Sequence, residues 1–243
     1  MPNPSGVENL SSVANYASIA ATALLAGGIV AILRKPGLRM RSVILHFAAG
    51  VIFSVVAVEL LPDIMERHVV WEIVVGFGAG VVLMLALRYF LEPAEEAPDG
   101  GGFPTALIAI IVVDLLVDGV IMGIGFISGT ETGTLLAVAI SIELAALGMA
   151  TATSLGSRRV TTRTAVLCLV GLALLVFVSA VLSAWLLGGI PDAYLEIVLS
   201  FGLAALLFLV TEELLVEAHE SSQSPLITAA FFAGFLLFML LPG

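Results

Sequence analysis

The chain has 243 residues, a formal net charge of −10, 60% apolar residues and only 12% charged residues, with a mean hydropathy of +1.17. A soluble domain carries roughly 25% charged residues, so these numbers exclude both a water-soluble globule and a disordered chain. Nineteen acidic against nine basic residues exclude a nucleic-acid-binding surface, and the single Cys168 excludes a disulfide scaffold. The composition predicts an integral membrane protein whose partners are cations and the lipid bilayer.

Eight apolar runs follow one another along the chain. A hydrocarbon core of roughly 30 Å needs about 20 apolar residues per helix, whereas the strands of a membrane barrel alternate over about ten residues. We expect transmembrane helices at 12–33, 42–62, 69–91, 104–127, 134–155, 164–188, 193–216 and 224–241. The predicted fold class is therefore all-α integral membrane, with residues 1–243 in a single transmembrane domain and 92–103 as an acidic cytoplasmic linker.

The basic residues indicate an orientation. They gather in the connection between the first two helices, at the end of the third, and between the fifth and sixth: Arg34, Lys35, Arg39, Arg41, Arg88, Arg158, Arg159 and Arg163. With eight alternating helices these positions share one side of the membrane, which the positive-inside rule assigns to the cytoplasm. We therefore expect both termini to be extracytoplasmic, in a multi-pass protein of the plasma (cytoplasmic) membrane.

The second and seventh helices share an acidic pattern. At a constant offset, Phe47, Glu59, Asp63 and Glu66 align with Phe201, Glu213, Glu217 and Glu220. Helices five apart cross a membrane in opposite directions, so the match predicts a 3+2+3 inverted repeat: 1–91, the central helices in 104–155, and 164–241. A chance match between two Leu/Val/Ala-rich helices is the alternative interpretation. In transporters built from inverted repeats, the substrate site lies near the midplane at the repeat interface.

Three acidic residues fall inside the two central helices. Asp114 and Asp118 are four apart, which places both carboxylates on one helix face. Glu143 falls at a similar depth in the antiparallel partner helix. A charged group at this depth costs about 2.5–3.5 kcal/mol on insertion scales, and no Lys or Arg lies at this depth in the sequence. The pattern predicts a divalent-cation site; protonated carboxyl groups that bond to neighbouring helices are the alternative.

Further polar residues lie toward the helix ends. We expect a cation to enter past Glu59 and Asp63 and to leave past Glu213, Glu217 and His219. Glu217, His219 and Glu220 could form a low-affinity release site, and for these three a solvated helix end is the alternative interpretation.

Small and hydroxyl residues complete the pattern. The pairs Gly76/Gly80 and Gly119/Gly123 predict close helix packing. Four hydroxyl residues could either line a polar path along the fifth helix or donate back to that helix: Ser141, Thr151, Thr153 and Ser154.

The motifs DLLVDG (114–119) and ELAALG (143–148) resemble the metal-binding motifs of the ZIP family of divalent-metal transporters. The segment FAAGVIFSVVAVELLPD, from Phe47, resembles the second helix of that family. The resemblance implies eight helices and uptake of zinc, iron, manganese or related ions toward the cytoplasm. This uptake would be driven by protons, driven by a gradient of the ion, or passive. It also implies that the protein forms homodimers. The metal ion would be the substrate, and no prosthetic group would be bound. Asp114 matches the motif histidine, Asp118 the motif glutamate and Glu143 the first position of the second motif.

The chain departs from the family pattern at five positions. Leu115, Leu144 and Leu147 stand where the family has polar or acidic ligands, so we expect one metal site instead of two. Val117 and Ala146 replace two prolines whose kinks free backbone carbonyls. A site with oxygen ligands alone suits Mn²⁺ or Mg²⁺, with Fe²⁺ and Zn²⁺ also open.

The predicted function is transport by alternating access, in which one repeat moves against the two central helices and protons reset the empty carboxylates. The main alternative is a non-transporting metal-binding or sensor protein of the same fold. A remote alternative is an intramembrane aspartyl protease, which needs aspartates from two helices and a GxGD sequence; Asp114 and Asp118 share one helix, and GIGF (123–126) lacks the aspartate. We therefore expect no enzyme activity.

Overall fold

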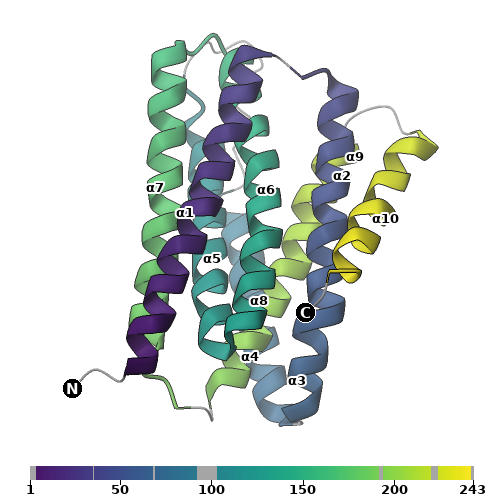
Figure 1. Cartoon of the computed structure of the whole chain (residues 1–243). Coiled ribbons are helices and arrows are strands. Elements are labelled where there is room, and N and C mark those ends of the chain that lie inside the picture. Colours follow the sequence, from purple (N-terminus) through teal and green to yellow (C-terminus); the bar gives the residue numbers. More distant parts are fainter. Residues whose placement is uncertain are drawn as a thin grey trace.

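The computed structural model describes residues 4–34, 36–67, 69–91, 103–191, 194–219 and 224–241. Lys35, Glu220 and positions 92–102 of the predicted linker lie outside the described residues. Helices and no β-strands make up the secondary structure of the described part, which confirms the all-α class (Figure 1). The elements are α1 (Pro4–Leu33), α2 (Leu38–Val55), η1 (Val56–Leu60), α3 (Leu61–Arg67), α4 (Val70–Leu91), α5 (Thr105–Ser128), α6 (Thr130–Ser157), α7 (Thr162–Leu187), α8 (Leu195–Phe208), η3 (Leu209–Leu214), α9 (Leu215–His219) and α10 (Pro225–Met239).

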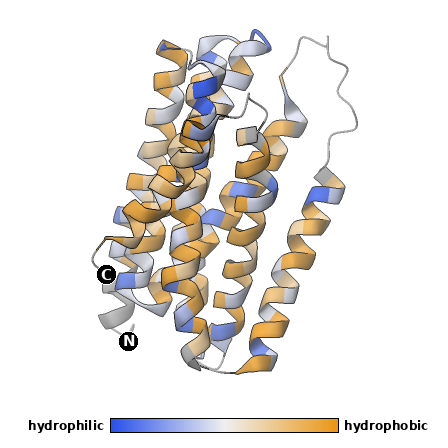
Figure 2. Ribbon diagram, turned by 90° about the vertical axis from the view of Figure 1, so that its right-hand side faces the viewer, coloured by the Kyte–Doolittle hydropathy of each residue, from blue (hydrophilic) through white to orange (hydrophobic). Residues whose placement is uncertain are grey.

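The helices are long and apolar, as a multi-pass membrane protein requires. Seven of them are long and apolar enough to cross a membrane, and hydrophobic residues cover most of their length (Figure 2). The eighth predicted span is α10, which has 15 residues and is therefore about 22 Å long. That length falls short of a hydrocarbon core of roughly 30 Å, so the eighth crossing stays a prediction.

The connection between α1 and α2 and the connection between α6 and α7 lie at the same, upper end of the bundle in Figure 1. The exposed Arg39 and Arg159 belong to this end, as the alternation of helices predicts. Which side of the membrane this end faces stays a prediction.

The second and seventh predicted spans each contain a π-helical turn. The first runs without a break through α2, η1 and α3, and the other through α8, η3 and α9. At the offset that aligns Glu59 with Glu213, η1 (Val56–Leu60) corresponds to 210–214 within η3 (Leu209–Leu214). Single π turns inside α-helices occur often at functional sites, and here they occupy matched positions.

The helices pack in pairs that map onto one another. α1 packs on α6 and α7 on α5; α2 packs on α10 and α4 on α8; α1 also packs on α7, and α5 on α6. Exchanging α1, α2 and α4 for α7, α8 and α10, and α5 for α6, turns each of these pairs into another observed pair. This pairing is compatible with the predicted inverted repeat, which stays a prediction.

Glycines bring two of these pairs into close contact. A Cβ at Gly80 of α4 would lie 2.8 Å from the carbonyl oxygen of Phe201 in α8, and one at Gly76 would overlap the carbonyl of Ile197. On the other side of the bundle, a Cβ at Gly234 of α10 would overlap the carbonyl of Phe47 in α2. The offset that relates Phe47 to Phe201 also relates Gly80 to Gly234. The predicted close packing at Gly76/Gly80 is confirmed.

Replacing Gly76 with alanine should therefore loosen the α4–α8 pair. We expect Gly76→Ala to lower the free energy of unfolding by about 1–3 kcal/mol, because the added methyl group meets backbone. Gly78 is a matched control on the same helix, since a Cβ there meets nothing within 4 Å. Gly78→Ala should leave stability unchanged or raise it by up to about 1 kcal/mol, since alanine favours helix. Thermal unfolding in detergent measures both, and equal melting temperatures for the two variants would contradict the packing argument.

Candidate metal centre

The turn between α5 and α6 sets the depth of the acidic residues. Only Gly129 separates the two helices. Asp114 and Glu143 are almost equally far from Gly129 along the chain, which places both about 21–22 Å from the turn at a rise of 1.5 Å per residue. Asp118 lies one helical turn nearer to Gly129 than Asp114. The hairpin therefore brings the three carboxylates together near the middle of α5 and α6.

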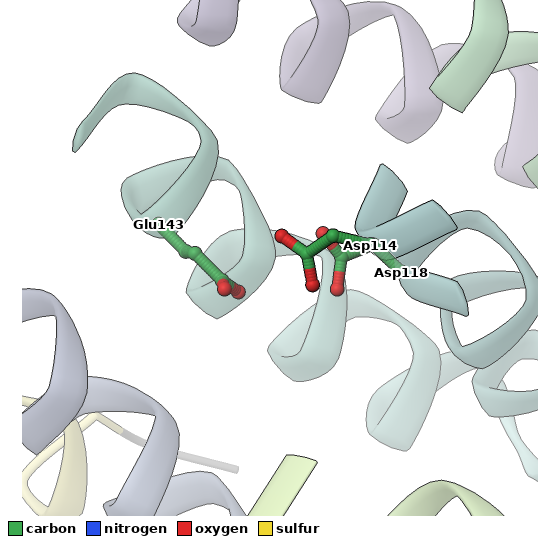
Figure 3. A group of neighbouring side chains, drawn as sticks. All are labelled: Asp114, Asp118 and Glu143. Atoms are coloured by element: carbon green, nitrogen blue, oxygen red, sulfur yellow. The ribbon is translucent and has the colours of Figure 1, made fainter. Parts of the chain in front are cut away.

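Asp114, Asp118 and Glu143, the acidic triad, are the predicted site residues that the structure brings together. Their relative exposures are 6%, 0% and 1%. One carboxylate oxygen from each residue lies within 4.8 Å of the others. Figure 3 shows the side chain of Glu143 pointing from α6 toward the two aspartates of α5. The described residues contain one such group of metal-ligating side chains.

Helix α7 fixes the position of α5 beside the acidic triad. Ser179 donates a hydrogen bond to the carbonyl of Leu116 at 2.8 Å, and Ser183 donates one to the carbonyl of Gly119 at 3.2 Å. A Cβ at Gly119 would lie 2.5 Å from the Cβ of Ser179, and one at Gly123 would overlap the hydroxyl of Ser183. The predicted close packing at Gly119 and Gly123 is thus confirmed, and α7 is the partner helix.

Helix α1 holds α6 in a similar way. A Cβ at Gly148 of α6 would overlap the carbonyl of Leu24, and one at Gly27 of α1 would overlap the carbonyl of Ala145. Leu144, directly after Glu143, and Leu115, directly after Asp114, are fully buried with no exposure. They offer no ligand atom, so the geometry of the site fits one ion.

The chemistry of the acidic triad suits a hard divalent cation. Neither α5 nor α6 contains a Lys, Arg or His residue, so three nearby carboxylates need protons, an ion or groups from other helices to balance their charge. The three oxygens lie at most 4.8 Å apart, so an ion equidistant from them would lie at most about 2.8 Å from each, against about 2.0–2.6 Å in bound Mg²⁺ or Ca²⁺ sites. Side-chain shifts of well under about 1 Å would close that difference.

The residues predicted where the ion enters lie outside the acidic triad. Glu59 is partly buried in η1, and its Oε1 accepts a hydrogen bond from the Thr132 hydroxyl at 2.9 Å. Asp63 is partly buried in α3. Sequence reasoning missed Thr132, because the expected helix began at position 134, two residues after it.

At the opposite end, the backbone of Glu213, Glu217 and His219 belongs to η3 and α9. Their side chains lie outside the described residues. The neighbouring Glu212 forms an ion pair with Arg88 of α4. Sequence reasoning used Arg88 only as a marker of orientation, and a contact between residues so far apart in the chain has no local signature.

The hydroxyl groups of α6 bond mainly within their own helix. Ser141 donates to the carbonyl of Ala137 at 2.6 Å, Thr151 to Leu147 at 2.8 Å and Thr153 to Met149 at 2.8 Å. These bonds favour back-bonding over a polar path for three of the four predicted hydroxyl residues.

No protein-family model matches the chain, and no curated protein sequence matches it significantly. The resemblance to the ZIP family therefore rests on the sequence pattern and stays a prediction.

Metal binding at the acidic triad should be measurable as added stability. We expect Mn²⁺ at about 100 times its dissociation constant to stabilise the folded protein by roughly 2.7 kcal/mol, which appears as a higher melting temperature. Glu143→Gln should abolish this shift, because it removes one of three anionic ligands. Glu131→Gln is the matched control, since Glu131 is exposed at the start of the same helix. A shift that survives in Glu143→Gln and disappears in Glu131→Gln would refute the site.

Proposed function

We propose that the protein transports divalent metal cations of the zinc, iron and manganese type across a membrane, with the metal as substrate at the acidic triad. The observation that carries this proposal is the burial of three converging carboxylates in the middle of two apolar helices. Intramembrane acidic residues are costly and mark ion pathways by default. The motif resemblance to the ZIP family agrees with it and adds the direction, toward the cytoplasm.

The packing suggests which helices move. Glycine and serine contacts fasten α1 to α6 and α7 to α5. The pairs α2–α10 and α4–α8 are each packed tightly on glycines as well. We therefore favour a cycle in which α1 and α7 stay with α5 and α6, and the two outer pairs move relative to them. This differs from the movement of a whole three-helix repeat against α5 and α6 that the sequence suggested.

Protons are the natural counter-charge for the empty site. Without an ion, three carboxylates this close repel one another, and protonation relieves that repulsion. A cycle that carries the metal one way and returns with protons would couple transport to a proton gradient. The resemblance further suggests a homodimer in the plasma membrane.

The competing function is a metal sensor of the same fold that does not transport. It is favoured by the near-complete burial of the acidic triad, whose residues are at most 6% exposed. An intramembrane aspartyl protease fits less well, because Asp114 and Asp118 come from the same helix.

Flux into liposomes that contain the purified protein tests the proposal. We would screen Mn²⁺, Fe²⁺, Zn²⁺, Co²⁺, Cd²⁺ and Mg²⁺ with an ion-sensitive dye inside the liposomes. Asp118→Asn should reduce flux of the transported ion at least about 100-fold, because it removes a fully buried ligand. The circular dichroism spectrum and elution volume of the variant should match those of the wild type.

The outcomes separate the candidate functions. Normal flux in Asp118→Asn would overturn the assignment of the site. Binding of metal without flux of any ion would support the sensor. Neither binding nor flux would mean that the acidic triad is a protonated structural group.

A further inference from the structure

We propose that Thr132 is a positioning residue that holds the Glu59 carboxylate in line with the acidic triad, where Glu59 makes the first contact with the incoming cation. The inference rests on the proposed transport function and deepens it. Thr132 is in the first turn of α6, and Glu59 is in η1. The two elements meet at the lower end of the bundle in Figure 1, where α6 begins and where α3 follows η1.

The contact itself is a hydrogen bond with a defined direction. The Thr132 hydroxyl donates to Oε1 of Glu59 at 2.9 Å, so it joins two elements from different parts of the chain. A carboxylate offers about four acceptor sites, and one donated bond orients the group while leaving capacity to ligate a cation. Both side chains are partly buried, and neither is enclosed as the acidic triad is. This combination of access and fixed orientation suits a capture point.

The register of α6 connects this contact to the acidic triad. Thr132 precedes Glu143 by about three helical turns, so the two side chains share one face of α6 and lie about 16 Å apart along its axis. Leu136 and Ala139 occupy the same face between them, at exposures of 1% and 2%. This face of α6 therefore has the polar Thr132 at one end, the buried apolar Leu136 and Ala139 in the middle, and Glu143 of the acidic triad at the other end.

The π turn explains how Glu59 reaches this face. A π turn inserts extra backbone into the helix and shifts the direction of the side chains that follow it by up to about 100°. Glu59 belongs to η1 itself, so the turn and the hydrogen bond to Thr132 determine its direction together. Leu136 and Ala139 are buried between Thr132 and Glu143, so an ion that followed this face of α6 from Glu59 to Glu143 would need these two residues to separate from their neighbours.

The test separates the half-saturating concentration of the ion, which reports its capture, from the maximal rate of flux. The protein must face one way in the membrane, with the Thr132 end of the bundle outside. An affinity tag at the N-terminus selects liposomes with this orientation, because α1 and α6 begin at the same end of the bundle. Initial flux is then measured against the outside concentration of Mn²⁺, with Zn²⁺ in parallel. We expect Thr132→Val to raise the half-saturating concentration about tenfold, the effect of losing one hydrogen bond to a charged group, with little change in the maximal rate.

Three further variants complete the design. Thr132→Ser keeps the hydroxyl and should restore the wild-type half-saturating concentration. Glu59→Gln should resemble Thr132→Val, and the double variant should be no worse than Glu59→Gln alone, since both act on one contact. Thr134→Val is the matched control, because the Thr134 hydroxyl donates to the carbonyl of Thr130 in its own helix. It should leave the curve unchanged.

Several results would overturn the inference. They are an unchanged curve in Thr132→Val, a lower maximal rate at an unchanged half-saturating concentration, and failure of Thr132→Ser to restore the curve. Melting temperatures of all variants identify a purely structural effect, which would also count against it. Wild-type protein that carries neither ion would overturn the proposed function together with this inference, whereas normal wild-type flux with an unaffected Thr132→Val would overturn this inference alone.

Discussion

The structure depends on burying three carboxylates inside an apolar helix pair. On insertion scales each charged residue costs about 2.5–3.5 kcal/mol at the centre of a helix, so three together would cost about as much as the roughly 5–15 kcal/mol by which a whole domain is stable. The α5–α6 hairpin contains no basic residue of its own to offset that cost. A cluster of this kind needs protons, a bound cation or polar groups from other helices to balance its charge, and the first two are what the proposed transport cycle exchanges.

Holding the acidic triad together requires rigid helices behind it. Ser179 and Ser183 bind carbonyls of α5 on either side of Asp118, and Gly148 brings α6 against α1. Both contacts exploit small residues, since bilayer lipid supplies no hydrophobic force between helices and close packing must replace it. The same logic recurs at Gly80 and Gly234 in the outer pairs. The contacts of α7 with α5 and of α1 with α6 hold the two helices that carry the acidic triad in place.

Hydropathy and spacing predict most of this arrangement, and the unpredicted parts share one cause. Runs of apolar residues locate every helix to within a few residues, except that α1 already begins at Pro4. Equal distances from the α5–α6 turn place Asp114 opposite Glu143. The π turns, the Thr132–Glu59 bond and the Arg88–Glu212 pair could not be predicted, because a shift in backbone hydrogen bonding has no compositional signal and contacts between distant residues depend on the final rotation of each helix. Those rotations follow from packing of the whole bundle.

The oxygen-only ligand set has a consequence for the choice of ion. Affinity at nitrogen, oxygen or sulfur sites rises from Mn²⁺ toward Zn²⁺, so an imidazole-rich site would bind zinc tightly and release it slowly. In the predicted resemblance to the ZIP family, Asp114 matches the motif histidine, and the buried Leu115 and Leu144 match positions where a second ion would need ligands. In the proposed cycle, a single site of three carboxylates would bind late transition metals more weakly than an imidazole-rich site, so that release of the ion would limit transport less. If ions reach such a site past Leu136 and Ala139, as the proposed route requires, selection among them would depend on the cost of removing their water there. Mg²⁺ dehydrates reluctantly, so an apolar route of this kind would disfavour the abundant hard cation that the ligands alone would accept.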